Sequence, residues 1–294
     1  MTWNPESSKD ISEDEYKEEL ERTDSIVLAA MRVSMDSGGI KTSNRFIVAT
    51  QLYTRLVVVS MTYMRILPFN RYVAIDGHHT DWPSAATLCR SIMEAYLSFF
   101  YIGLERVSKL ESDFRMELFT YHRNSEKYKY FKEGGSEELL KPFRENLPKD
   151  KEALGKKADE LGLSAVHRKR ALSGRHAHYL SRDEILARIP FGTKEVPRFY
   201  TFFSYQVHST PLAFMSQSND RGRREPNPVE LEYLVFTMWL VRKYLSAAVV
   251  GMHQLFPHHY RERVAATRGH ELAAAFVLAK AELASILKAN AAGA

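Results

Sequence analysis

A pair of opposite charges in an apolar stretch is the first feature that could do chemistry. Arg90 and Glu94 lie four residues apart within residues 82–107, which are otherwise almost entirely apolar. A helix that is apolar on nearly every side is normally buried, and charges on a buried helix need partners. Because arginine before glutamate is the weaker order for a local pair, we expect the partners to come from other helices.

The expected partners carry hydroxyl and imidazole groups. Tyr200, Ser204 and His208 recur every four residues and would line one helical face, while His122 lies on the helix that follows the apolar one. An arginine could hold a phosphate or carboxylate in its fork, and a histidine beside a glutamate could act as acid or base. The predicted acid–base residues are His208, Glu94 and His122, and the predicted ligand-binding residues are Arg90, Tyr200, Ser204 and Arg115.

The same residues also fit a structural role. A buried network of arginine, glutamate and histidine can fix the register of packed helices without any chemistry. The chain would then be a non-catalytic interaction or regulatory module. Whether it is an enzyme stays open at this point.

Two resemblances bear on this choice. Arg90 and Glu94 in an apolar helix, followed by the Tyr200, Ser204, His208 segment, resemble an uncharacterised bacterial all-helical domain family over residues 85 to 212. That resemblance implies a helical fold and recurring polar positions, and it implies no defined activity.

The second resemblance is to HEPN-type helical domains, whose ribonuclease members carry an arginine and a following histidine with four to six residues between them. Arg115 and His122 fit this spacing best, two turns apart on a predicted helix, although the residue after the arginine, often polar in those nucleases, is Met116 here. This resemblance implies RNA cleavage. The other three matching pairs are Arg71/His78, Arg170/His176 and Arg263/His270.

A basic run without acidic residues, 166–178, could contact phosphates together with Arg221, Arg223 and Arg224. Most such runs are solvated surface, and no aromatic residue within this run could stack on a base. An anionic ligand or RNA is therefore the partner class that the sequence favours, with its identity open.

Metal and cofactor signatures are not found. The histidine pairs His78-His79, His176-x-His178 and His258-His259 contain no Glu-x-x-His or His-Glu-x-x-His pattern of a bundle metal site. P-loop, dinucleotide and serine-nucleophile motifs are also absent from the sequence. We predict no metal and no cofactor.

The elements that must position these residues are all helices. Capping residues and apolar periodicity predict helices over about 12–35, 43–68, 82–107, 109–132, 228–256 and 270–289, and a short buried helix within 195–215. The predicted fold is an all-α, multi-helix up-and-down bundle forming a single domain over 1–294. Residues 136–192 are predicted to be a polar insertion or cap of short helical pieces, broken at Pro148, Gly155 and Gly162, and residues 290–294 a frayed tail.

The composition fits a globular protein, with 45% hydrophobic and 26% charged residues and a net charge of +5. Cys89 is the only cysteine, which excludes an internal disulfide and fits a reducing compartment. The start of the chain has no apolar signal region, and Arg55 and Arg65 interrupt the longest apolar run. We expect a cytoplasmic protein without a membrane partner, and a homodimer through the alanine-rich last helix is compatible with either function.

Overall fold

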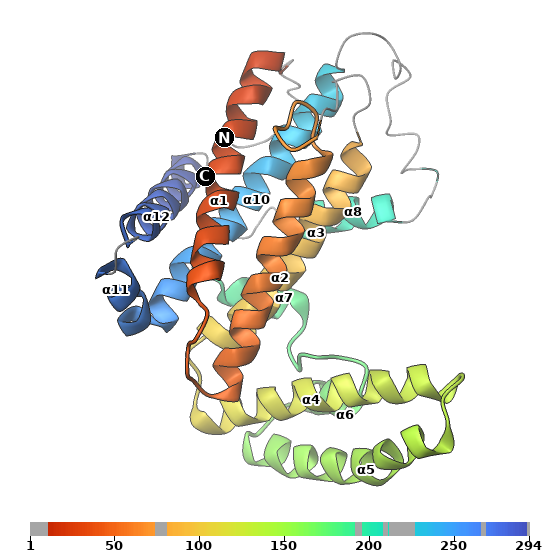
Figure 1. Ribbon diagram of the computed structural model, residues 1–294. Helices are drawn as coiled ribbons and strands as arrows, with labels where there is room; N and C mark the ends of the chain where they lie inside the picture. The colour runs from red at the N-terminus through yellow and green to blue at the C-terminus, as the bar shows by residue number, and fades with distance from the viewer. Residues whose placement is uncertain are drawn as a thin grey trace. The chain divides into compact units, whose positions relative to one another are not determined.

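The computed structural model describes residues 11–73, 81–191, 196–207, 211, 227–265 and 269–292 of the 294-residue chain. Every regular element in this part of the chain is a helix (Figure 1), which confirms the predicted all-α fold. The chain divides into two compact units: unit 1 comprises residues 1–104 and 189–294, and unit 2 comprises Glu105–Arg188.

Unit 1 is a helical bundle built around its most buried helix. Its elements are α1 (Glu13–Asp36), α2 (Asn44–Ile66), α3 (Trp82–Phe99), the π-helix η1 (Phe100–Leu104), α8 (Val196–Val207), α10 (Pro228–Leu255), α11 (Pro257–Ala265) and α12 (Gly269–Ala292). Helices α1, α3 and α12 pack against α10 (Figure 1). The core of the unit therefore lies along α10, whose side chains are buried over almost its whole length.

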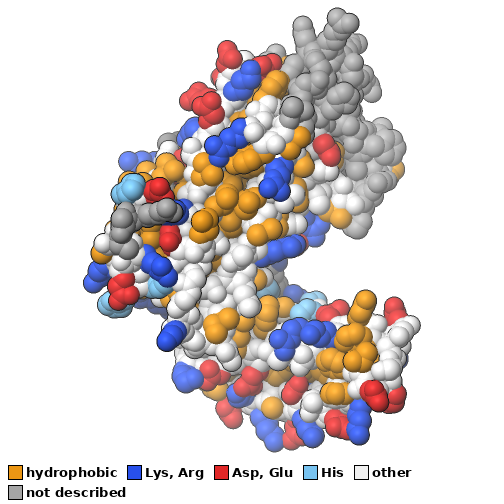
Figure 2. Space-filling model, viewed as in Figure 1, with side chains coloured by type: hydrophobic (Ala, Val, Ile, Leu, Met, Phe, Trp, Pro, Cys, Tyr) orange, Lys and Arg blue, Asp and Glu red, His pale blue; other side chains and the backbone are white. Residues whose placement is uncertain are grey.

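Two helices, α2 and α10, are long and apolar enough to cross a membrane by length and composition alone. In α10, 89% of the apolar stretch is buried inside the protein, as in a core helix, whereas in α2 the share is 39%. Hydrophobic side chains gather on the face that α1 and α2 present (Figure 2), and the exposed ones on these helices include Leu28, Met35 and Val58.

Local signals start the helices where the sequence predicted. Ser12 and Glu15 form the reciprocal capping box of α1. The Asp81 side chain accepts a hydrogen bond from the Ser84 N–H at the start of α3, and Asn227 caps α10.

The apolar stretch 82–107 is not one α-helix. Its α-helical part ends at Phe99, and η1 continues to Leu104. Arg45 on α2 donates hydrogen bonds to the carbonyls of Ile102 (2.6 Å) and Gly103 (3.3 Å). A Cβ at Gly103 would lie 2.9 Å from the Ala49 Cβ, so the glycine permits the close approach of α2.

Unit 2 contains α4 (Lys109–Lys132), α5 (Glu137–Glu160), α6 (Ala165–Leu172) and α7 (Arg182–Arg188), with α4 and α5 packed as a hairpin. Residues 136–188 of the predicted insertion thus share a compact unit with α4. The predicted breaks at Pro148 and Gly155 are wrong, since α5 continues through both. A proline inside a helix costs on the order of 3 kcal/mol, and burial of Leu140, Leu154 and Ala158 offsets this cost.

Two further boundaries differ from the sequence prediction. The segment predicted as a short buried helix within 195–215 is helical as α8, over Val196–Val207. The last helix continues to Ala292, three residues beyond the predicted end, so most of the expected frayed tail is helical.

Candidate functional site

Three of the predicted site residues meet in unit 1. Arg90 and Glu94 on α3 pair through Nε and Oε1 at 3.1 Å, and Arg90 Nη2 donates to the Tyr200 hydroxyl of α8 at 3.0 Å. The Tyr200 hydroxyl in turn donates to Glu94 Oε1. We call these three residues the Arg90 site. Its side chains are partly open to solvent, with exposed fractions of 24% for Arg90 and 47% for Glu94.

Aromatic packing holds α8 against α3 and α10 beside this site. Trp82 at the start of α3 stacks on Phe202 of α8 (ring centroids 5.7 Å apart) and on Tyr233 of α10 (4.6 Å). Phe199 and Phe236 join α8 to α10 at 4.1 Å. Since these rings fix α8, the position of the Tyr200 hydroxyl is set by the core and not by its hydrogen bonds alone.

The Arg90 site is electrostatically coupled. Burial alone would lower the pKa of Arg90, but the hydrogen bonds and charges of Tyr200 and Glu94 raise it above its usual value. Burial raises the pKa of Tyr200; the hydrogen bond to Glu94 raises it further, and Arg90 opposes the shift. The guanidinium carbon of Arg90 also lies 4.5 Å from the centroid of the Tyr200 ring, within the range of a cation–π contact. Tyr200 is therefore a protonated donor next to a permanent cation.

The other members of the predicted helical face do not join this contact set. The Ser204 hydroxyl donates to the backbone carbonyl of Tyr200 at 2.6 Å, one turn earlier on its own helix. His208 lies outside the described residues, as do His78, His79 and the arginines at 221, 223 and 224.

Arg115 and His122 belong to unit 2 and make separate contacts there. The Arg115 side chain is 2% exposed and pairs with Glu105 (2.6 Å) and Glu111 (2.5 Å). The Tyr179 hydroxyl donates to the same Glu111 carboxylate at 2.6 Å. Nδ1 of His122 instead lies 3.0 Å from the Gly174 carbonyl oxygen. The helical spacing of Arg115 and His122 therefore does not produce a direct contact between them.

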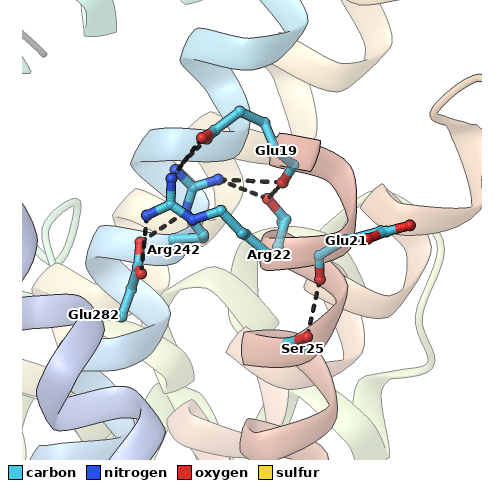
Figure 3. Close-up of polar contacts among 7 residues, drawn as sticks. Glu19, Glu21, Arg22, Ser25, Arg242 and Glu282 are labelled. Carbon is cyan, nitrogen blue, oxygen red and sulfur yellow. Dashed lines mark hydrogen bonds and ion pairs between the residues drawn. The ribbon is translucent and has the colours of Figure 1, made fainter. Parts of the chain in front are cut away.

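The sequence reasoning missed a buried ion network in unit 1, the Arg242 network (Figure 3). Arg242 on α10 is 3% exposed and bonds through Nε to Glu282 of α12 at 2.8 Å and through Nη2 to Glu19 of α1. Its Nη1 donates to the Thr23 hydroxyl at 3.1 Å, and Arg22 pairs with Glu19 at 2.7 Å. The available signal was the one used for Arg90, an arginine inside an apolar helix.

Among the described residues, no group of three or more His, Cys, Asp or Glu side chains lies together as a metal site would require. Comparison with protein-family models, curated proteins and solved structures found no match to this chain.

Proposed function

We propose that the Arg90 site binds an anionic ligand and exchanges protons with it. The observation that supports this proposal is the access of solvent to an arginine–glutamate–tyrosine group that shares hydrogen bonds. Where the Arg242 network surrounds its guanidinium with acceptors from two other helices, the Arg90 site leaves part of its charge available.

Two groups of the Arg90 site remain available to a ligand. Nε and Nη2 of Arg90 are used within the site, and Nη1 has no partner in the part of the chain that the structure describes. Both contacts to Glu94 go to Oε1, so Oε2 likewise has no partner in the described residues. A cationic donor thus lies beside a carboxylate acceptor, and an arginine fork suits a phosphate or carboxylate.

RNA is the ligand class to test first, with cleavage of its backbone as the reaction. In this proposal Glu94 accepts the proton of a ribose 2′-hydroxyl as its oxygen attacks the adjacent phosphorus. Tyr200 gives its proton to the departing 5′-oxygen, and Arg90 stabilises the charge on the phosphoryl oxygens. The contact between Tyr200 and Glu94 would return the proton afterwards. This version of a HEPN-like activity depends on the Arg90 site and not on Arg115 and His122.

The test is cleavage and binding of a single-stranded RNA by the full chain, with Glu94→Gln as the first variant. Removing a general base lowers a rate by about 10²–10⁴-fold, so we expect a loss in that range. Glu152→Gln is the matched control, because Glu152 pairs with Lys156 (2.8 Å) in the same four-residue spacing on an exposed helix face. An unmodified protein that neither cleaves nor binds RNA would contradict the proposal.

The second candidate is an interaction or regulatory module in which the Arg90 site is structural. It is favoured by one observation: Tyr200 of α8 bonds to both charged groups of α3, which ties the two helices together. Val277 and Leu278, 67% and 40% exposed on α12, offer the surface for the proposed homodimer. Under this proposal Tyr200→Phe lowers the melting temperature by several degrees and changes no activity.

A further inference from the structure

A loop of unit 2 is held closely against α4. Gly174, directly after α6, has a φ of +68°, and a Cβ at this position would lie 2.8 Å from the Ser125 Oγ. Nδ1 of His122 lies 3.0 Å from the Gly174 carbonyl oxygen. Only glycine combines this backbone conformation with this approach, so the sequence builds the loop into a fixed place beside His122.

This docking gathers two arginines and two histidines, none of which forms an ion pair with a carboxylate in the described residues. His122 lies on α4, Arg170 in the last turn of α6, and Arg175 and His176 in the loop; we call these four the loop cluster. Nε of Arg170 donates to the His178 carbonyl oxygen at 3.1 Å, which orients the guanidinium without neutralising it.

The other arginines around the loop cluster differ from Arg170 and Arg175 in this respect. Arg168 pairs with Asp159 (2.7 Å), Arg182 with Asp183 (3.0 Å), Arg188 with Glu105 (2.9 Å), and Arg115 with Glu105 and Glu111. Arg170 and Arg175 are therefore uncompensated where the loop meets α4. Arg123 of α4, which bonds to Asn124, and Lys169 of α6 are further cations without a carboxylate partner in the described residues. In Figure 2 histidine side chains lie next to lysine and arginine side chains on the unit that contains α4 and α6.

The histidines report this positive surrounding. Burial lowers the pKa of His176, and the charges of Arg170, His122 and Arg175 lower it further. The pKa of the neighbouring His178 falls to about 4, through burial first and then the charges of Arg170, Arg115, His122 and His176. These imidazoles are neutral at pH 7, and an added anion would favour their charged forms.

The acidic groups near the loop cluster are engaged elsewhere or at its edge. Glu126, one turn after His122, interacts with that histidine and pairs with Lys129 at 2.6 Å. The charge of Asp150 on α5 contributes to the raised pKa of Tyr121, the residue before His122. In the part of the chain that the structure describes, neither carboxylate contacts Arg170 or Arg175.

We infer that the loop cluster binds a phosphate group, with Arg170 and Arg175 as the permanent cations and His122 and His176 as hydrogen-bond donors. A phosphate would supply the negative charge that no carboxylate of the described residues brings to Arg170 and Arg175. Its oxygens can accept hydrogen bonds from several donors at once. The group can be free phosphate, a nucleotide or the backbone of a nucleic acid. This site lies in unit 2 and does not depend on the function proposed for the Arg90 site.

The test titrates the full chain with inorganic phosphate, adenosine monophosphate and a single-stranded RNA, using calorimetry for the first two and fluorescence anisotropy for the third. We expect the double variant R170A/R175A to bind at least tenfold more weakly. The control R168A/K169A removes the same charge from α6 itself and should change binding less than threefold. Equal losses in both would show general electrostatic attraction and overturn the inference, as would an unmodified protein that binds none of the three.

A third variant separates geometry from charge. Gly174→Ala keeps every cation but displaces the loop from Ser125, so it should weaken binding several-fold while circular dichroism shows intact helices. Retained affinity in this variant would contradict a built site. Binding of RNA without free phosphate or nucleotide would assign the site to a nucleic-acid backbone. The loss caused by R170A/R175A should be as large in the R90A background as in the unmodified chain, because the two sites are independent, so failure here and failure at the Arg90 site can be told apart.

Discussion

The Arg242 network and the Arg90 site use the same chemistry at different depths in unit 1. Each has an arginine on a core helix that pairs with a glutamate and with a hydroxyl from another helix. Arg242 is 3% exposed and its partner Glu282 10%, whereas Arg90 is 24% exposed and Glu94 47%. The buried network satisfies its guanidinium entirely with protein, whereas the Arg90 site stays in contact with solvent.

This difference determines what each group can contribute. A buried ion pair is weak evidence for net stability, but removing one partner leaves a charge that water cannot reach. A partly exposed pair is screened and contributes little to folding. We therefore expect loss of stability from changes in the Arg242 network and loss of function from changes in the Arg90 site.

The largest expected effect is that of Arg242→Ala. Glu19 and Glu282 would lose the buried cation that they share and keep only the more exposed Arg22 as a partner. Loss of a buried partner lowers the free energy of unfolding by about 3–5 kcal/mol. Urea unfolding followed by tryptophan fluorescence measures it cleanly, because Trp82 and Trp239 lie in unit 1 and unit 2 has no tryptophan. The triple variant R242M/E19Q/E282Q should recover most of the loss. A change below about 1 kcal/mol in Arg242→Ala would remove the contrast between the two groups.

In unit 2, burial of His178 should make the stability depend on pH. The folded pKa of His178 is about 4, below the usual 6.5, so between these values the unfolded chain binds more protons than the folded one. The stability contributed by neutral His178 is complete above pH 6.5 and is lost as the pH falls toward 4. The loss is on the order of 2–3 kcal/mol.

Hydrogen exchange across 105–188 at pH 7, 6 and 5 measures this dependence within unit 2. His178→Asn should flatten it, because asparagine does not titrate. An unchanged pH dependence in that variant would show that other groups carry the effect.

Sequence patterns predicted much of the fold because its signals are local. The Ser12–Glu15 capping box marks the start of α1, and apolar periodicity marks the core helices. The continuity of α5 through Pro148 was not predictable in this way, since packing against α4 overrides the local cost of proline.

The candidate site was predicted in part for a related reason. A spacing of four residues places Arg90 and Glu94 on the same face of α3. The four-residue pattern on α8 includes Tyr200, which contacts that face. Spacing alone does not show which side chains form ion pairs with a given charged residue. Arg115 pairs with Glu111 one turn earlier on α4, but also with Glu105, which lies before that helix, and Arg242 pairs with Glu282 forty residues away along the chain.

The smallest stability effect, and the sharpest test of the contrast, belongs to Arg90→Ala. Because Arg90 is partly solvated and Glu94 can be hydrated once the arginine is gone, the free energy of unfolding should fall by less than about 1 kcal/mol. Ligand binding and any RNA cleavage should nevertheless disappear, since the cation of the site is lost. Arg90→Lys keeps the charge but not the fork that reaches Glu94 and Tyr200 together, so it should restore only part of the activity. A fall in stability as large as that of Arg242→Ala would place the Arg90 site with the buried network and favour the structural role.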